Sequence, residues 1–161
     1  MSSIPLITSD DQQEQLYLFA ICDHLFAVSP KWLDSIIAPV DIIPTPGVPA
    51  HIQGLCAVQN KVVAVFDCRY YLLESGQIHK EYKASRYMIL TASGMEAAIP
   101  ISVSYGFKSL KEFEIDEQNN SIVYTDNDVF RGLIRYDGKI VRVINAASLL
   151  SVARVPLEEV V

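Results

Sequence analysis

The sequence predicts an all-β protein made of two similar halves, each with about five short strands. Short apolar runs alternate with turn residues along most of the chain, which is typical of β-hairpins. In addition, residues 52–67 match residues 130–145 without a gap, which indicates an internal repeat. About five strands in each half are enough to close a small barrel, and closure removes the exposed edges of a free sheet.

Composition and charge exclude several kinds of partner. The chain has 161 residues, 50% of them apolar and 20% charged, which is ordinary for one folded domain. Its net charge of −6 and its scattered basic residues argue against nucleic acid. No apolar run reaches the roughly 18 residues that span a bilayer, and the polar, acidic start lacks the layout of a signal peptide. We therefore expect a cytoplasmic protein that does not insert into membranes.

The three cysteines agree with a reducing compartment. Cys22, Cys56 and Cys68 are odd in number, widely spaced and set in apolar context. We expect them to be small core residues that remain thiols.

The first half begins after a polar segment. Residues 1–14 are expected to form a flexible N-terminal arm, and two apolar runs around a short polar break predict a hairpin over 15–28. Ser29–Pro30 has the pattern of an N-cap followed by proline, which predicts a short helix over 31–34. Prolines exclude long regular structure over 39–50, so an extended loop is expected there.

A second hairpin follows the proline-rich loop. Its strands are predicted over 55–58 and 62–66, with a turn at 59–61. Asp67 is placed to cap a short helix through Leu73, because its carboxylate can accept hydrogen bonds from the first-turn amides.

The second half repeats this order after a polar connector at 74–84. Strands are predicted over 86–91 and 95–99, around an Ala-Ser-Gly turn. A polar, Asn-rich loop is expected at 116–121.

The final hairpin has the clearest turn signal in the chain. Its strands are predicted over 132–136 and 139–144, and Asp137–Gly138 between them can adopt the positive φ angles of a tight primed turn. Asn145 then caps a final helix over 146–152.

The gapless repeat matches the same structural features in both halves. The matched pairs include Gly54 with Gly132, Lys61 with Lys139, Val63 with Val141, Val65 with Val143, and the caps Asp67 with Asn145. The leading hairpins match more weakly, as Tyr17 with Tyr87, Ala27 with Ala97 and Pro30 with Pro100. Two unrelated hairpin-then-helix segments can also look alike, but a match that includes glycine, turn, strand and cap favours duplication. The four valines should point into the core.

Duplication predicts one folded unit over residues 15–152. We expect two intertwined lobes at about 15–80 and 81–152, followed by a tail at 153–161.

The sequence contains no arrangement typical of catalysis or metal binding. The histidines, His24, His51 and His79, have no Cys, His or carboxylate partner at ligand spacing. The glycines are isolated rather than gathered in a phosphate-binding loop, and a solvated loop explains the acidic residues between 112 and 117 better than acid–base chemistry does. We therefore expect no enzymatic activity, no cofactor and no metal.

Surface apolar residues are the better sign of function. Rigid walls hold open the turns of a closed barrel and the groove between two barrels, which makes both natural docking sites for proteins. Trp32, the only tryptophan, lies beside the proline-rich run. Two roles are open for it: a core plug between the halves, or an anchor for a partner protein.

Several motifs occur in the order and spacing of a known family. The family motif Tyr-Gly-Val-Asp-Ile is similar to Phe-Ala-Val-Ser-Pro at 26–30. The family's next motif, Val-x-Glu-Ile, is similar to Leu-Asp-Ser-Ile at 33–36. Pro-Ala-His-Ile-Gln-Gly at 49–54 is similar to its proline-containing approach to Ile-x-Gly. Val-Val-Ala-Val-Phe-Asp-Cys-Arg at 62–69 is similar to its Val-Ile-Pro-Val-Ile-Asp-Leu-Arg, and the final hairpin and helix also fit. Over residues 16–150 the chain resembles the CheW family of chemotaxis adaptors.

The resemblance implies a fold of two five-stranded SH3-like β-barrels packed together, with short helices after the hairpins. It implies a role in chemotaxis-like signal transduction, in which an adaptor couples a CheA-type histidine kinase to the cytoplasmic tips of chemoreceptors. Both partners would dock on barrel surfaces and on the groove between the two lobes.

The family pattern is altered where its members make contacts. Where the family has the turn Asn-Leu-Arg-Gly, this chain has Ala-Val-Gln-Asn at 57–60. A neutral hydrogen-bond donor therefore replaces a charged one. A charge-assisted hydrogen bond is about twice as strong as a neutral one. The family's Glu is Ser35, and its Val-Asp after the second hairpin is Ile-Ser at 101–102. The candidate protein-binding residues that match the family's contact positions are Leu33, Ser35, Ile36, Val58, Gln59 and Asn60.

These changes leave two other hypotheses open. One is an accessory CheW-like protein of a pilus-type or other chemosensory-like system, with non-standard partners. The other is a small-ligand-binding β-barrel, which would need a deep internal cavity lined by polar groups. A core filled by Leu, Val and Ile from both halves would favour the adaptor.

Overall fold

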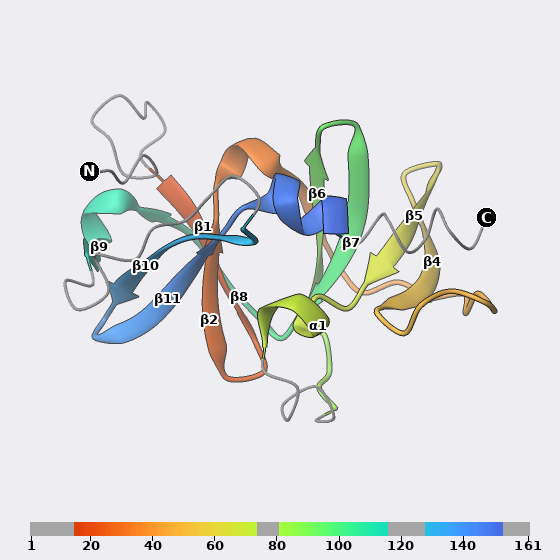
Figure 1. Ribbon diagram of the computed structural model, residues 1–161, viewed down its shortest axis with the longest axis horizontal. Coiled ribbons are helices and arrows are strands. Elements are labelled where there is room, and N and C mark those ends of the chain that lie inside the picture. The colour runs from red at the N-terminus through yellow and green to blue at the C-terminus, as the bar shows by residue number, and fades with distance from the viewer. Residues whose placement is uncertain (1–14, 74–80, 116–127, 153–161) are drawn as a thin grey trace.

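The computed structural model describes residues 15–73, 81–115 and 128–152, most of which are strands (Figure 1). The expected N-terminal arm, the C-terminal tail, the loop at 116–121 and residues 74–80 of the connector lie outside the described residues. Within the described residues, the strands form two sheets. None of the helices found there is long and apolar enough to cross a membrane.

We call the barrel formed by the six-stranded sheet the first barrel. Across the sheet, its described strands are β8 (Val103–Ser109), β1 (Gln15–Ile21), β2 (His24–Val28), β11 (Lys139–Ile144), β10 (Phe130–Tyr136) and β9 (Phe113–Ile115). Neighbouring strands are antiparallel except β2 and β11, which run parallel.

The second barrel is formed by the five-stranded sheet. Across this sheet, its described strands are β3 (Leu33–Ile37), β6 (Arg86–Ala92), β7 (Met95–Ile101), β5 (Lys61–Phe66) and β4 (Ile52–Val58). Here β5 and β7 are the parallel pair. The predicted all-β fold with two small barrels is thus confirmed, although the first barrel has six described strands where five were expected.

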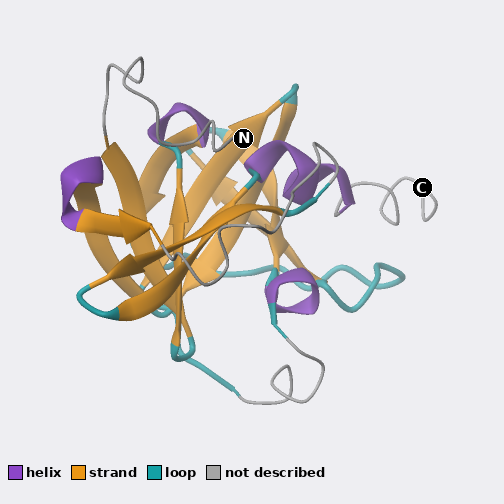
Figure 2. Ribbon diagram, turned by 60° about the vertical axis from the view of Figure 1, so that its left-hand side comes forward, coloured by secondary structure: helices purple, strands orange, loops and turns teal. Residues whose placement is uncertain are grey.

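The helical segments are short. The helix α1 (Arg69–Leu72) follows β5, and a helix over 146–152 follows β11. Single 3-10 turns cover Pro30–Trp32 (η1) and Leu110–Glu112 (η3). Figure 2 shows these segments at the ends of strands, outside the sheets.

Both predicted capping side chains make their hydrogen bonds. The Asn145 side chain accepts a hydrogen bond from the Ser148 amide at 3.3 Å. The Asp67 carboxylate accepts from the Arg69 amide at 3.1 Å, although the backbone N-cap of α1 is Cys68, one residue later than predicted. The Asp67 side chain therefore accepts a hydrogen bond from an amide of the first helical turn, although Asp67 lies one residue before the N-cap.

Each barrel is built from both halves of the sequence. The β1–β2 hairpin joins β10 and β11 through the parallel pair β2–β11, and the β6–β7 hairpin joins β4 and β5 through the parallel pair β5–β7. The expected lobes at 15–80 and 81–152 are therefore not the two barrels. The reason is that the leading hairpin of each half pairs with the closing hairpin of the other half.

The closing hairpins of the two halves are equivalent, as predicted. Gly54 faces Val65 and Gly132 faces Val143, and the register shifts just before each glycine. A Cβ atom added at Gly54 would lie 2.2 Å from the Ile43 carbonyl oxygen, and the φ angle there is +148°. Only glycine fits this close approach between the proline-rich loop and β4.

The turns of these hairpins are equivalent as well. Gln59 and Asn60 have φ angles of 48° and 68°, and Asp137 and Gly138 have φ angles of 50° and 78°. Positive φ at both central residues is the requirement of a type I′ turn. The first turn therefore has two residues instead of the three predicted, and Lys61 belongs to β5.

The leading hairpins are equivalent with a shift of one residue from the predicted match. Ala27 lies opposite Val143, and Ala98 lies opposite Val65. Ala27 therefore corresponds to Ala98 and not to Ala97. The same shift makes the other two predicted pairs wrong, Tyr17 with Tyr87 and Pro30 with Pro100. A shift of one residue exchanges the faces of a strand, so only the corrected match places equivalent side chains in equivalent cores.

The sequence pattern missed the strands β3, β8 and β9. The helix expected over 31–34 is the single turn η1, and Leu33 already begins β3. Both β3 and β8 contain a register shift, at Asp34 and at Tyr105, which interrupts the period of two along the strand.

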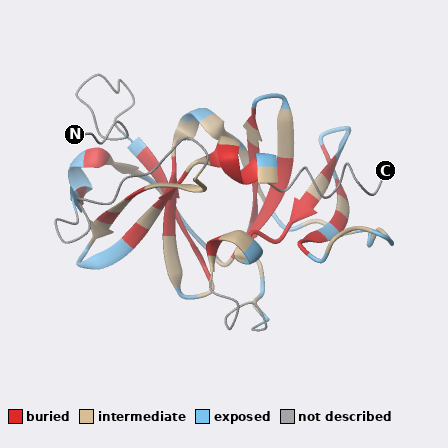
Figure 3. Cartoon of the chain, in the orientation of Figure 1, coloured by how far each residue is buried: buried red, intermediate tan, exposed pale blue. Residues whose placement is uncertain are grey.

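Within the described residues, a central core lies between the barrels and a smaller core fills each barrel. Alternate side chains of β1 point to different cores: Tyr17 and Phe19 to the central core, Leu16 and Leu18 to that of the first barrel. The valines that were predicted to point inward are Val63 (3% exposed), Val65 (0%), Val141 (0%) and Val143 (2%). Figure 3 shows the exposed residues mainly at turns and at the outer ends of the molecule.

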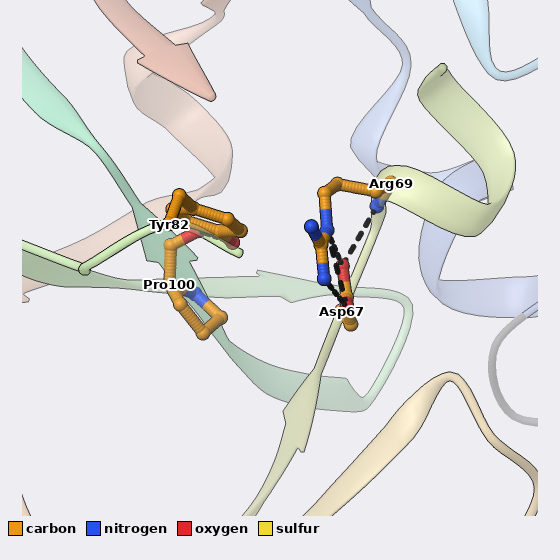
Figure 4. A network of polar contacts seen from close by, with 4 residues as sticks. All are labelled: Asp67, Arg69, Tyr82 and Pro100. Carbon is orange, nitrogen blue, oxygen red and sulfur yellow. Dashed lines mark hydrogen bonds and ion pairs between the residues drawn. The ribbon is translucent and has the colours of Figure 1, made fainter. Parts of the chain in front are cut away.

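A buried ion pair connects the end of β5 to α1. The Arg69 guanidinium donates to the Asp67 carboxylate from Nη2 at 2.7 Å and from Nε at 2.9 Å, and Asp67 is only 3% exposed. The guanidinium lies 4.8 Å from the centre of the Tyr82 ring. The Tyr82 hydroxyl, whose pKa is raised by burial, donates to the Pro100 carbonyl at 2.9 Å (Figure 4). These contacts link α1 to β7.

Truncation of an inward valine tests the strand register. Val143→Ala is expected to lower the free energy of unfolding by about 2 kcal/mol, because it removes two buried methyl groups and leaves a cavity. Val62→Ala is the matched control, since Val62 is 71% exposed on the equivalent strand of the other barrel. Denaturant titration of both variants should separate them clearly. Equal stability of Val143→Ala and the wild type would contradict the register.

Removal of Arg69 tests the buried ion pair. Arg69→Ala is expected to lower the free energy of unfolding by about 3–5 kcal/mol, because it leaves the Asp67 carboxylate buried without its guanidinium partner. Lys61→Ala is the control: the pair of Lys61 with Glu96 spans 3.0 Å but is exposed to solvent, so its loss should matter little. Similar losses in both variants, measured by denaturant titration, would mean that burial of the Asp67–Arg69 pair has no special importance.

Candidate protein-docking surface

The structure places the predicted docking residues on two elements of the second barrel. Leu33, Ser35 and Ile36 lie half-buried on β3, which is an edge strand paired with β6. Gln59 and Asn60 are exposed at the tip of the β4–β5 turn. Val58 differs from these five residues, because it is 6% exposed and packs in the core of the second barrel.

One end of the second barrel brings these elements together. The Lys61 ammonium forms an ion pair with the Glu96 carboxylate, which joins the β4–β5 turn to the β6–β7 turn. Glu96, and to a smaller extent Asp34 on β3, raises the pKa of Lys61. Because Leu33 is paired with Leu90 near the end of β6, the start of β3 lies at this end too. Figure 1 shows both turns on the same side of the barrel.

A surface hollow lies beside this end. It is lined by Lys31 and Trp32 of η1 and by residues 91–96 of the β6–β7 hairpin. Trp32 is half-buried, and it packs against the central core while its ring also lies 4.7 Å from the Lys31 ammonium. Trp32 therefore contributes to the central core and also borders the candidate docking end.

The sequence pattern did not reveal three exposed apolar side chains along the edge strand β8. Val103, Tyr105 and Phe107 are 39%, 46% and 51% exposed on this edge strand of the first barrel. We call these three residues the β8 stripe. Because Tyr105 lies outside the ladder, Phe107 shares the sheet face of Tyr17 and Val103 shares the opposite face of Ala20, so no simple alternation in the sequence marks these residues.

The β8 stripe is anchored at one end by Tyr17. The Tyr17 ring contacts the Phe107 ring edge-on, with 5.4 Å between the ring centroids. The Tyr17 hydroxyl also forms a hydrogen bond with the Ser104 hydroxyl. Burial is the main cause that raises the pKa of Tyr17. These contacts hold Phe107 on a rigid base while half of its surface remains exposed.

The β8 stripe and the predicted β3 residues occupy equivalent strands. Phe107 faces Tyr17 on β1, and Ile36 faces Met88 on β6. Tyr17 corresponds to Met88 in the corrected match of the leading hairpins, so Phe107 corresponds to Ile36. Each barrel thus presents one edge strand at the same place, with a strongly exposed aromatic side chain only on the first.

The barrel interiors do not resemble ligand sites. Side chains of Leu, Val, Ile, Ala, Cys and aromatic residues fill the described cores of both barrels. Among the described residues, no group of three or more His, Cys, Asp or Glu side chains could hold a metal ion. A filled core is the outcome that favours an adaptor over a small-ligand-binding barrel.

Fold and surface together define the class of the protein: a pair of β-barrels that presents exposed apolar side chains, three of them on the edge strand β8. A family model described as the CheW-like domain matches residues 15–154, and the chain belongs to this family. Among solved structures, it is similar to the scaffolding protein TtCheW from Thermoanaerobacter tengcongensis. The two are 18% identical, the match covers 84% of this chain and 91% of that one, and the TM-score is 0.67. A comparison with curated proteins finds no match.

Proposed function

We propose that the protein is a non-catalytic adaptor that couples a CheA-type histidine kinase to the cytoplasmic tips of chemoreceptors. The observation that carries this proposal is the pair of equivalent edge strands, β3 and β8, which present different chemistry on two barrels joined by one core. A rigid body with two different edges can hold two different partners in a constant relative orientation. Membership of the CheW-like family agrees with this role.

In this proposal the kinase binds the end of the second barrel that carries Leu33, Ser35, Ile36, Gln59 and Asn60. This end is partly apolar, and the exposed turn adds a few hydrogen-bonding groups. Such a patch suits a transient interface, in which a few central residues supply most of the affinity. Val58 would support the turn from the core without touching the partner.

The changed turn suggests a kinase different from the standard one of the family. Gln59 and Asn60 stand where the family has Arg and Gly, so the strongest donor of the turn is missing. We therefore favour a partner kinase encoded alongside this protein, as in an accessory chemosensory-like system.

Restoring the family turn tests the kinase site. The double variant Gln59→Arg/Asn60→Gly should gain about tenfold in affinity for a standard CheA kinase and lose affinity for the kinase encoded with this protein. The backbone should tolerate the change, because Asn60 has a φ angle of 68°, which glycine adopts readily. Titration calorimetry with each kinase gives both affinities. If neither moves while the circular dichroism spectrum stays unchanged, this end is not the kinase interface.

We propose that the β8 stripe binds the receptor tip. Phe107→Asp should weaken binding of a chemoreceptor cytoplasmic fragment by at least about tenfold, because it places a charge in an apolar contact. Val62→Asp is the control, since Val62 is an even more exposed apolar residue on the other barrel. Sedimentation of each variant with receptor fragments measures the difference. Equal binding by Phe107→Asp and the wild type would exclude the β8 stripe as the receptor site.

A further inference from the structure

The closing hairpin of the second barrel, β4–β5, has an apolar face that points away from the barrel. Cys56 and Val63 point into the barrel core, so their neighbours along β4 and β5 point outward. We call these outward residues, together with the loop residue that bridges to β4, the outer apolar face. Its members are Leu55 paired with Ala64, Ala57 paired with Val62, and Ile43 bridged to Leu55.

The outer apolar face continues a surface that is covered elsewhere. Ala64 on β5 pairs with Ala97 on β7, and Ala97 is buried in the central core. Exposure rises with distance from that core. Ala64 is half-buried, whereas Val62 and Ile43 are 71% and 65% exposed, the highest values among the large apolar side chains of the described residues. A sheet face of this kind is normally packed against another element.

The first barrel shows that the hairpin itself does not require an apolar outer face. There Arg135 and Arg142 occupy the places of the two outward alanines, and β9 places Glu114 opposite Arg135. Charged side chains of both signs keep that face in contact with water. The apolar residues at the equivalent places of the second barrel therefore indicate that a further segment covers them.

The chain continues from a point close to this face. Leu149 and Leu150 of the helix over 146–152 are buried in the same central core as Ala97 of β7. Figure 1 shows this helix between the two barrels, beside β7. The nine residues 153–161 span about 30 Å when extended. From β7 across β5 and β4 to the bridged residue Ile43 there are about three strand spacings, or about 14 Å, so the segment is long enough to cross the whole face.

The composition of residues 153–161 suits an apolar surface. The segment reads Ala-Arg-Val-Pro-Leu-Glu-Glu-Val-Val, so four of its side chains are Val or Leu. The matched caps Asp67 and Asn145 set the offset between the halves, and with this offset Val160 corresponds to Tyr82. Tyr82 packs back against the central core in the first half. A stable interface between two proteins takes about 20–30 residues a side, so this small face fits a short segment better than a second copy.

We propose that residues 153–161 bind the outer apolar face of the same molecule and continue the cover that the helix over 146–152 begins. Val155 and Leu157 supply the apolar contacts with Val62 and Ile43. The short connection to the helix keeps the effective concentration of the segment high, so a small contact area is sufficient. The proposal does not depend on the kinase and receptor sites above, because neither site includes this face.

Tryptic cleavage after Arg154 tests the proposal on the full chain, because a protease cuts a segment only when it is released from the fold. We expect Leu157→Asp and Val62→Asp each to raise the rate of this cleavage about tenfold, because each places a charge in the apolar contact. Ile140→Asp is the matched control. Ile140 is the equivalent residue of the first barrel and is 41% exposed, so its change should leave the rate as in the wild type. Mass spectrometry of the fragment that ends at Arg154 measures the rate.

Three outcomes would overturn the proposal. The first is cleavage of the wild type as fast as that of a free peptide of residues 150–161, because the segment would then be unprotected and the face open to another protein. The second is cleavage of Val62→Asp at the wild-type rate. The third is protection that increases with protein concentration, which would assign the face to a second copy. The two variants change opposite sides of the contact, so Leu157→Asp still decides the test if Val62→Asp does not fold.

Discussion

The burial of both faces of the two leading hairpins is the constraint on which the rest of the structure depends. In β1 all residues after Gln15 are buried, and in β7 all residues after Glu96 are buried. A strand with two apolar faces needs cover on both sides. The exchange of hairpins between the halves supplies that cover. The closing hairpin of the other half completes a barrel on one face, and the second leading hairpin packs across the central core on the other.

This constraint also determines where partners can bind. Because the leading hairpins use both faces for the cores, exposed apolar groups are left on the edge strands β8 and β9 and beside turns, and half-buried ones on the edge strand β3. An edge strand with large exposed apolar side chains is prone to association, so a monomeric protein rarely carries one without a partner for it. The central core and the Asp67–Arg69–Tyr82 network hold the two barrels in one arrangement. The edges are therefore presented at a constant separation, as an adaptor requires.

Those parts of the fold with strong local signals could be predicted from the sequence. The Asp137–Gly138 turn, the capping side chains and the gapless match around Gly54 all rest on short-range chemistry, and the structure confirms them. The edge strands β3 and β8 could not be predicted, because each contains one residue that is not paired with the neighbouring strand. These residues, Asp34 in β3 and Tyr105 in β8, interrupt the alternation of side chains along the strand. The exchange of hairpins could not be predicted either, because strand pairing between distant segments leaves no local pattern. Sequence comparison was also insufficient for Val58, one of the candidate docking residues. It matches a contact position of the family, but that match did not reveal that its side chain points into the core.

The duplicated backbone explains how one small chain can acquire several different surfaces. Core positions in the two barrels hold similar side chains, such as Val65 and Val143, because both must fill the same kind of interior. Outward positions on the same strands do not share this restriction. Ala64 and Arg142 occupy equivalent places and face solvent at least in part, so a charge can be added there without repacking either barrel. The outward surfaces of the two barrels have thus diverged in charge on a common framework.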